Sequence, residues 1–272
     1  MSADKWMEER TRIKRKTGNV ITNFTMSSVP EKDCEKVFCA ETYYAVLYWS
    51  MDKYVLEFVA AAPDDLKTIL KLIPGNTIIR VVYKKECDLD ALFTSQGIRL
   101  YATYQRNVTR YKSNPYLLPE TSKRRQLLPK MYDPECGEYP VREDAEELDR
   151  LHRQVFDPLC DDMFTREEWI EKIDNREILV YRKGGEITAY YCFRLEGKKL
   201  YSNMSVNTGA ANTLYNMERR IFEEMWNKGI RIFYGWYNLK NIRAKNHAIS
   251  TAAPNLCIES FSRSFCNTYY KS

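Results

Sequence analysis

The fold is decided by one continuous stretch in the second half of the chain, LYSNMSVNTGAANTLYNMERRIFEEMWNKGIRIFYGWY, residues 200–237. Leu200–Val206 and Ile230–Tyr237 have the β-branched and aromatic composition of strands. Between them, four apolar residues recur at helical spacing before the helix-ending Gly229: Leu214, Met217, Ile221 and Met225. The stretch therefore predicts a β-α-β unit, a crossover that is almost always right-handed.

The flanking sequence extends this unit into a larger layout. Two strands precede it, Glu177–Tyr181 and Ile187–Arg194, and Gly184-Gly185 forms the turn between them. Thr165-Arg-Glu-Glu168 is a capping box that opens a helix through Ile173. The remaining predicted elements are a helix over Val141–Val155, a helix over Asn241–Ser250 and one or two closing strands over Leu256–Tyr270. The predicted order is α-α-β-β-β-α-β-α-β.

The first half repeats the last six of these elements. Its predicted strands are Tyr43–Trp49, Tyr54–Val59, Thr77–Tyr83 and Ile98–Gln105, with helices after Pro63 and around Leu89–Phe93. We therefore expect an α/β (α+β) protein of two tandem domains with mixed, mostly antiparallel sheets, the first domain being reduced. The expected boundaries are a first domain at 1–112, which begins with a basic arm, a Pro-rich linker at 113–139 and a second domain at 140–272.

Composition excludes several classes of protein. The chain has 272 residues and a net charge of +5, which is too mild to indicate nucleic-acid binding. It contains no G-x-G-x-x-G, P-loop or G-x-S-x-G motif, which argues against dinucleotide, P-loop and nucleophile-elbow enzymes. Two histidines and eight scattered cysteines have no zinc-ligand spacing, so we expect no metal and reduced thiols. Without a bilayer-length apolar run or an export signal, we expect a cytoplasmic protein with no membrane partner.

The loop between the predicted strand and the long helix is the candidate binding site. Ser205–Thr213 is small, neutral and free of carboxylates. A helix N-terminus with such residues lets a phosphate approach the backbone amides. In the first half, the matching stretch Ala60–Asp65 ends in two carboxylates, which would repel an anionic ligand. Only the second copy is therefore expected to hold a phosphorylated cofactor, although an ordinary polar turn with a capping Asn or Thr explains the same residues.

Residues 140–272 resemble the GCN5-related N-acetyltransferase (GNAT) superfamily, and the first half resembles a reduced copy of that fold. Three stretches carry the resemblance. Val141–Leu148 is similar to the opening of the family's first helix, and Leu200–Val206 with Met217–Ile230 is similar to its fourth strand and long helix. Trp236–Ala244 is similar to its fifth strand and the following N-x-x-A helix start.

The resemblance implies acetyl-CoA, or another acyl-CoA, as co-substrate. Ser205 and Val206 would contact the pantetheine arm through their backbone, in a gap where family strands splay. The pyrophosphate loop would fall on Gly209, Ala210 and Asn212, although the family's Arg/Gln-x-x-Gly-x-Gly/Ala spacing is absent. Asn241 would lie beside the cofactor thiol.

Acyl transfer to an amine needs a base for the ammonium proton and an acid for the departing thiolate. The family's tyrosine acid, expected seven residues after Asn241, is Ala248 here. A histidine side chain has an unperturbed pKa of about 6.5, so the neighbouring His247 could serve in either role. Tyr201 and Tyr237 lie on the strands that would flank the site and are the other catalytic candidates. For each of the three, local packing is the alternative interpretation.

The leading hypothesis is an N-acetyltransferase that moves an acyl group from acetyl-CoA directly to a small-molecule amine or a peptide. A non-catalytic binding module on a decayed acyltransferase fold is the first alternative. The second is an aminoacyl-tRNA-dependent transferase, because such enzymes also use tandem copies of this fold. A nucleic-acid partner is not expected from the charge, and the oligomeric state is left open.

Overall fold

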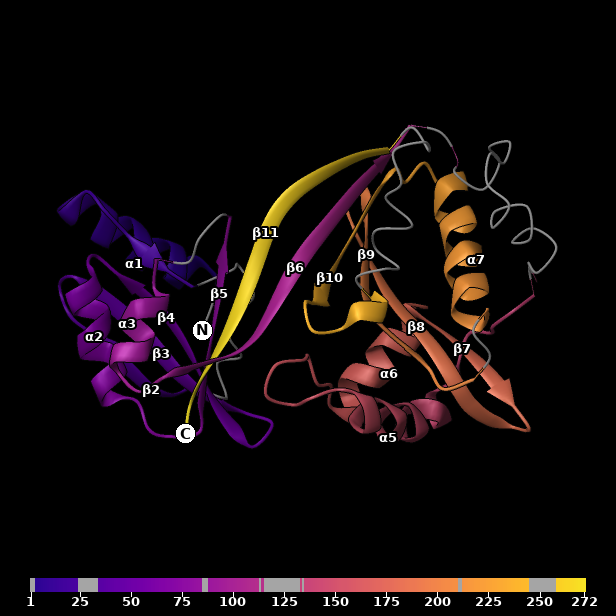
Figure 1. Cartoon of the computed structure of the whole chain (residues 1–272), viewed down its shortest axis with the longest axis horizontal. Helices are drawn as coiled ribbons and strands as arrows, with labels where there is room; N and C mark the ends of the chain where they lie inside the picture. The colour runs from indigo at the N-terminus through magenta and orange to yellow at the C-terminus, as the bar shows by residue number, and fades with distance from the viewer. Residues whose placement is uncertain are drawn as a thin grey trace. The chain divides into compact units, whose positions relative to one another are not determined.

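The structure is a computed structural model that describes residues 3–23, 34–84, 88–112, 114, 133, 135–209, 212–244 and 258–272, with only the backbone of 258–263 (Figure 1). The chain forms two compact units. Unit 1 comprises Met1–Gln105, Asn238–Lys240 and Arg263–Ser272, and unit 2 comprises Arg106–Tyr237 and Asn241–Ser262. Strands β6 (Arg99–Tyr111) and β11 (Ile258–Lys271) contribute residues to both units.

Unit 1 contains a sheet with the strand order β2-β3-β4-β5-β11-β6. Its other elements are α1 (Ala3–Thr17), β1 (Ile21–Thr22), β2 (Cys34–Cys39), β3 (Tyr43–Ser50), β4 (Lys53–Ala60), α2 (Pro63–Leu72), β5 (Thr77–Tyr83) and α3 (Asp90–Ser95). Strands β2, β3 and β4 form an antiparallel meander, β5 runs parallel to β4, and β11 runs antiparallel to β5. Strand β1 lies off this path and pairs with β4.

Helices cover both faces of the unit 1 sheet. Leu56 and Phe58 of β4 lie in one hydrophobic cluster with α2 and α3, whereas Val59 lies in another with α1. Neighbouring strand residues face opposite sides, which explains the division. The basic arm predicted at the N-terminus is instead the packed helix α1, because Trp6 and Ile13, two turns apart, are fully buried.

Unit 2 contains the strand order β6-β10-β9-β8-β7. Its elements are the one-turn helix η3 (Arg142–Asp144), α5 (Ala145–Val155), α6 (Arg166–Asp174), β7 (Ile178–Lys183), β8 (Glu186–Glu196), β9 (Lys199–Asn207), α7 (Thr213–Asn227) and β10 (Ile232–Asn238). Strands β7, β8 and β9 are antiparallel, and β10 runs parallel to β9. Helices α5 and α6 pack on one face with Tyr190 and Val206, and α7 packs on the other with Tyr191 and Leu200.

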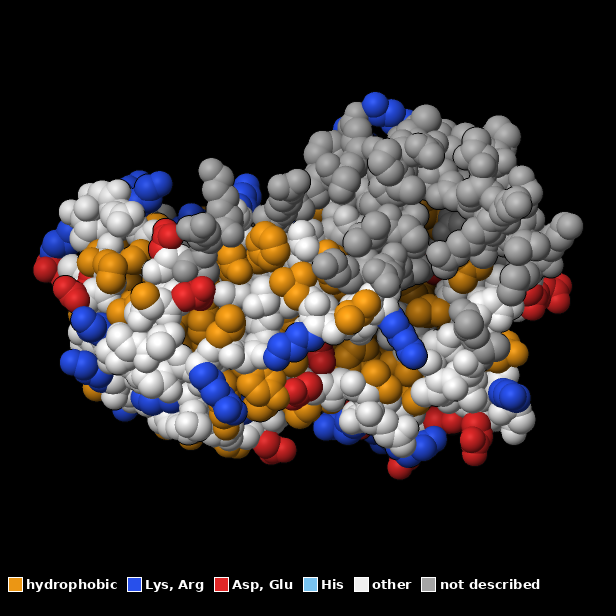
Figure 2. All heavy atoms as spheres, viewed as in Figure 1, with side chains coloured by type: hydrophobic (Ala, Val, Ile, Leu, Met, Phe, Trp, Pro, Cys, Tyr) orange, Lys and Arg blue, Asp and Glu red, His pale blue; other side chains and the backbone are white. Residues whose placement is uncertain are grey.

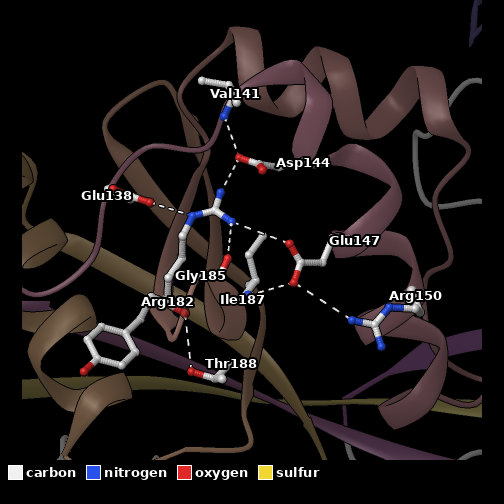
Figure 3. Close-up of polar contacts among 10 residues, drawn as sticks. Glu138, Val141, Asp144, Glu147, Arg150, Arg182, Gly185, Ile187 and Thr188 are labelled. Carbon is white, nitrogen blue, oxygen red and sulfur yellow. Dashed lines mark hydrogen bonds and ion pairs between the residues drawn. The ribbon is translucent and has the colours of Figure 1, made fainter.

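Arg182 of β7 ties the start of α5 to the β7–β8 hairpin (Figure 3). Its guanidinium contacts Glu138 at 2.7 Å, Asp144 at 2.6 Å and Glu147 at 3.5 Å. Glu147 also accepts the backbone N–H of Ile187 at 2.8 Å. Because one arginine meets three carboxylates from two segments, the network fixes where α5 lies on the sheet.

The predicted fold class is confirmed. The capping box at Thr165 forms as expected, with Thr165 Oγ1 accepting from Glu168 N and Glu168 Oε2 accepting from Thr165 N. The domain boundaries at 1–112, 113–139 and 140–272 remain a prediction about the two copies of the fold. The compact units differ from them: unit 1 ends its first segment at Gln105 and also includes Asn238–Lys240 and Arg263–Ser272. The last segment belongs to unit 1 because β11 pairs with β5. Pairing between strands so far apart in sequence cannot be read from their order.

The described surface mixes charges of both signs. Figure 2 shows Lys and Arg side chains interspersed with Asp and Glu on the viewed face, in keeping with the small net charge. Among the residues that the structure describes, no helix is both long and apolar enough to span a bilayer.

Candidate functional site

The parallel strands β9 and β10 pair over only part of their length. Ile232–Gly235 pairs with Lys199–Ser202, and the pairing stops at Ser202 and Gly235 although both strands continue. We call this point the β9–β10 fork. On its other edge, β9 pairs with β8 up to Asn207. Within the described residues, no strand pairs with the β10-facing edge of 203–206, so the main-chain groups on this edge lack a partner strand among those residues.

A bulge lies at the β9–β10 fork. The register with β8 shifts between Cys192–Met204 and Phe193–Ser202, which makes Asn203 the extra residue. The bulge changes which face later side chains occupy: Leu200 lies in the α7 cluster, whereas Met204 and Val206 lie in the α5–α6 cluster despite the same parity. Bulges that redirect side chains in this way are common beside active sites.

Gly235 is required at the β9–β10 fork. A Cβ atom built at Gly235 would lie 2.9 Å from the backbone oxygen of Ser202, closer than real Cβ contacts. The sequence GWY around this glycine therefore reflects close approach of two backbones, and not a turn, since Gly235 lies within β10.

The loop after β9 leads into the start of α7. Thr208 N donates to Thr188 O at 2.9 Å, and Gly209 N donates to Asn207 Oδ1 at 3.0 Å, so these two amides already have partners. Asn212 is the N-cap residue of α7, with no side-chain hydrogen bond to the helix, and the first turn carries no acidic residue. The N-terminal end of α7 therefore keeps its partial positive charge without a carboxylate nearby in sequence.

The predicted binding residues that the structure describes lie on β9, between β9 and α7, and at the turn that begins with Asn241. Ser205 and Val206 lie on β9 beyond the β9–β10 fork, with Ser205 half-buried and Val206 buried. Asn241 caps a short helical turn, since its Oδ1 accepts from Ala244 N at 3.0 Å, as the N-x-x-A pattern predicts. Ala210 and His247 lie outside the described residues.

The other histidine, His152, has a structural role. It is fully buried, its Nε2 lies 2.9 Å from the Asp162 carbonyl oxygen and its Nδ1 lies 2.6 Å from the Tyr190 hydroxyl. Because a carbonyl can only accept, Nε2 carries the proton and Nδ1 accepts from Tyr190. Burial lowers the pKa of His152, so the ring stays neutral near pH 7. His152 thereby holds the loop after α5 to β8.

The two predicted tyrosines lie on either side of the β9–β10 fork. Tyr201 stacks on Tyr234 with ring centroids 4.9 Å apart, one residue before the end of pairing. Burial raises the pKa of Tyr201, which favours its neutral form. Tyr237 is half-buried on β10 two residues beyond Gly235, and burial raises its pKa too.

Charged and aromatic side chains gather around these tyrosines, and sequence reasoning missed the charged ones. We call this group the fork cluster: Arg106, Arg194, Glu196, Tyr201, Tyr234 and Trp236. Arg194 lies over the ring of Tyr201 at 5.6 Å, and Arg106 lies over the ring of Tyr234 at 4.6 Å. The cluster lies on the α5–α6 face of the sheet, because Tyr201 follows Leu200, whose side chain packs in the α7 cluster on the opposite face. Its members come from four strands, so no local motif could reveal it.

Glu196 links the two halves of the fork cluster. Its two carboxylate oxygens accept from Arg194 and from the Tyr234 hydroxyl. Burial opposes its ionisation, but these hydrogen bonds and the charges of Arg194 and Arg106 outweigh burial and lower the pKa of Glu196. Glu196 is therefore an anion whose acceptor oxygens are both engaged.

Unit 1 contains a similar fork, in which β1 and Asn23 bond to the strand edge beyond the parallel pairing. Strands β4 and β5 pair in parallel only at Tyr54–Val55 with Thr77–Ile78, which we call the β4–β5 fork. Beyond it, β1 pairs with β4 on the edge that β3 leaves free. Asn23 continues this pairing: its Nδ2 donates to Leu56 O at 2.8 Å, and its Oδ1 accepts from Phe58 N at 2.7 Å. The main-chain groups of β4 are thus satisfied from within the chain.

Solved structures share the fold of this chain. An acetyltransferase of the GNAT family from Novosphingobium aromaticivorans is similar over 87% of this chain and 91% of its own, with a TM-score of 0.50 and 13% identity. The chain has the GNAT fold. The resemblance seen in the sequence is therefore confirmed at the level of the fold, and it extends over both halves.

Two further structures have the same degree of similarity to this GNAT-fold chain. A GCN5-related N-acetyltransferase from Sphaerobacter thermophilus covers 85% of this chain and 78% of its own, with a TM-score of 0.50 and 12% identity. A conserved protein of unknown function from Staphylococcus epidermidis covers 91% of this chain and 100% of its own, with a TM-score of 0.51 and 8% identity. No family model and no curated protein matches the sequence. A shared fold hosts many activities, so function has to be argued from the site.

Proposed function

We propose that the chain is an acyl-CoA-dependent N-acyltransferase that transfers an acetyl group from acetyl-CoA to a primary amine. The observation that carries the proposal is the β9–β10 fork, where no described strand pairs with the edge at 203–206 and the chain then leads toward an α7 N-terminus without acidic residues. Pantetheine carries amides that can pair with a strand edge, and a pyrophosphate is stabilised by a helix N-terminus. One continuous segment of unit 2 thus matches the two chemical parts of coenzyme A.

In this proposal the amine nitrogen attacks the thioester carbonyl, the carbon–sulfur bond breaks, and coenzyme A leaves as a thiol. Ser205 and Val206 would hold the pantetheine arm through their backbone, and Gly209, Ala210 and Asn212 would surround the pyrophosphate. Asn241 would lie beside the thiol. His247 is the proposed group for proton transfer. Tyr237 and Tyr201 are the other candidates, because each lies on one of the two strands that form the fork.

A single isosteric change tests the cofactor site. Asn212→Asp places a negative charge at the start of α7, where it should stabilise the helix by about 0.3–1 kcal/mol and repel a phosphate. We expect the affinity for coenzyme A to fall about tenfold while the melting temperature in the absence of ligand stays equal or rises. The readouts are isothermal titration with coenzyme A and release of free thiol from acetyl-CoA with a panel of amines.

Asn227→Asp is the matched control, since it adds the same charge in the last turn of α7, where Asn227 is exposed. It should lower stability slightly and leave coenzyme A affinity unchanged. Equal affinities in both variants, or no binding of coenzyme A to the wild-type protein, would exclude the proposed site.

A non-catalytic binding module is the second candidate function. It is favoured by the hydrogen bonds that already engage the amides of Thr208 and Gly209, two residues of the presumed phosphate loop. Such a module would bind coenzyme A or another ligand without releasing thiol in the presence of any amine. Thiol release that depends on the amine concentration would rule this candidate out.

A further inference from the structure

We propose that Arg106 binds a carboxylate of the acceptor, so that the acceptor is an amino acid or a peptide terminus and not a simple amine. The inference rests on the proposed acyltransfer and names its substrate class. Arg106 lies on β6, which is the neighbour of β10 in the sheet.

The first step is the pairing of charges in the fork cluster. Arg194 and Glu196 form an ion pair, and the second oxygen of Glu196 accepts from Tyr234. Arg106 is close enough to influence Glu196 electrostatically, yet no carboxylate of the described residues lies within ion-pair distance of it. The carboxylate that influences Arg106, that of Glu196, is thus already bonded to Arg194 and Tyr234. Arg106 is therefore the cation of this cluster that forms no ion pair with a described residue.

The second step is the way Arg106 is held. Its guanidinium lies 4.6 Å from the ring centroid of Tyr234 and 6.0 Å from that of Trp236. Ring faces attract the cation and restrain its plane, but they leave its N–H groups free to donate to a ligand. The Nε atom is buried and has no hydrogen-bond partner among the described residues. A planar guanidinium restrained in this way suits a carboxylate, which accepts two parallel N–H bonds.

The third step is the position of Arg106 along the sheet. Tyr234 is one residue before Gly235 and Trp236 is one residue after it, so the two rings beneath Arg106 bracket the β9–β10 fork. Tyr234 also stacks on Tyr201, which brings the same face of β9 into the group. An acceptor bound by its carboxylate at Arg106 would have its amine close to the point where β9 becomes available to a thioester.

Matched pairs of acceptors test this inference directly. We would measure thiol release from acetyl-CoA with single amino acids and with their amides, which differ only in the carboxylate. The wild-type protein should prefer the acids at least tenfold in kcat/KM. In Arg106→Met, which keeps an unbranched apolar side chain, that preference should disappear mainly through KM, while activity with the amides and affinity for acetyl-CoA are retained.

Two controls separate substrate binding from a structural role. Arg110→Met removes an exposed arginine from the same strand and should leave the acid preference unchanged. Arg106→Lys keeps the charge and should retain part of the preference. If Arg106→Met instead lowers activity equally with acids and amides, or if wild type prefers the amides, Arg106 has no role in acceptor choice and the inference is wrong.

A binding experiment keeps the two proposals distinguishable. N-acetyl amino acids and N-acetyl amino acid amides, the products of the two reactions, are titrated in a thermal-shift assay without any coenzyme. Stabilisation by the acids alone, lost in Arg106→Met, would support the anion site even if no transfer were detected. Coenzyme A binding and thiol release without discrimination between acid and amide would uphold the proposed function and overturn this inference alone.

Discussion

The β4–β5 fork and the β9–β10 fork share a strand layout and differ in what occupies it. In unit 1, β1 and Asn23 bond to the free edge of β4, with Asn23 reaching both Leu56 O and Phe58 N. In unit 2, no described strand pairs with the corresponding edge of β9. The amide side chain of Asn23 makes the kind of hydrogen bonds that a ligand amide would make.

The helices that follow the two forks, α2 and α7, also differ in whether a carboxylate lies at their N-terminal end. In unit 1, Asp65 accepts from Ala62 N and from the Thr42 hydroxyl, which places a carboxylate at the beginning of α2. In unit 2, α7 begins without an acidic residue. The comparison shows that, in the described part of the chain, the same strand layout is bonded by a further segment in unit 1 and by none in unit 2. The two units also differ in the residues at the strand edge and at the helix start.

The largest expected effect follows from removing the internal occupant of unit 1. Asn23→Ala leaves Leu56 O and Phe58 N without partners in a site where Asn23 is only 6% exposed. We expect a loss of about 2–4 kcal/mol in the free energy of unfolding, because two buried backbone groups become unsatisfied. Urea denaturation measures it.

The exposed Asn19 provides a matched control, and Asn19→Ala should change the stability by less than about 0.5 kcal/mol. Coenzyme A affinity should be unchanged in both variants, since the proposed site lies in unit 2. A stable Asn23→Ala variant would show that the contacts of Asn23 do not hold the β4–β5 fork closed.

The next largest effect is on the pH dependence of stability. It concerns the residue that lies two positions after the last paired residue of β4 and of β9. That residue is Met204 in unit 2 and Glu57 in unit 1, where burial raises the Glu57 pKa to about 7 while the charge of Arg80 opposes the rise. Below pH 4.5, Glu57 is protonated in the folded and unfolded chain alike. As the pH rises toward 7, the unfolded chain loses this proton first, so stability falls.

Glu57→Gln removes this titration. Its stability relative to wild type should increase by about 2 kcal/mol between pH 4.5 and pH 8, as measured by denaturation at several pH values. The comparison at each pH is between the variant and wild type, so general acid effects cancel. A difference that stays constant with pH would mean that Glu57 ionises normally and that unit 1 tolerates a charge beyond its fork.

The smallest expected effect on stability comes from crowding the last residue pair of the β9–β10 fork. Gly235→Ala places a Cβ 2.9 Å from Ser202 O and should cost about 1–2 kcal/mol, because the two strands must move apart. The same shift should weaken coenzyme A binding several-fold if the β9–β10 fork holds the pantetheine arm. Thermal denaturation and titration with coenzyme A give both values.

Gly209→Ala is the folding control, because its Cβ would make an ordinary 3.4 Å contact with Thr188 Oγ1 and its φ is not positive. It should fold with wild-type stability. If Gly235→Ala is as stable as this control, the backbones do not need the close approach that the geometry indicates.

Much of the fold could be predicted because it is written in local patterns. Helical spacing at Leu214–Met225 and the turn at Gly184-Gly185 correspond to α7 and to the β7–β8 hairpin. The N-terminal helix was missed because its core contacts consist of two residues, Trp6 and Ile13, among many charges. Strand β2 (Cys34–Cys39) was missed because only Phe38 of its six residues is buried.

The candidate site was less predictable than the fold. The loop Ser205–Thr213 stood out because it lacks carboxylates. Arg106 and Glu196 could not be recognised from the sequence, because they lie in separate stretches of the chain. Only the folded structure brings both into contact with Tyr234 of β10.

The amino-acid sequence by itself determined the order of strands and helices, the repeat of that order and the lack of acid at the start of α7, since these depend on neighbouring residues. Tertiary structure alone decided which strand edge is open. Pairing of β1 with β4, of β11 with β5 and of β10 with only the first residues of β9 joins segments distant in sequence. Hydrogen bonds between such segments depend on register and on competing partners, and neither is encoded in the periodicity of a single segment.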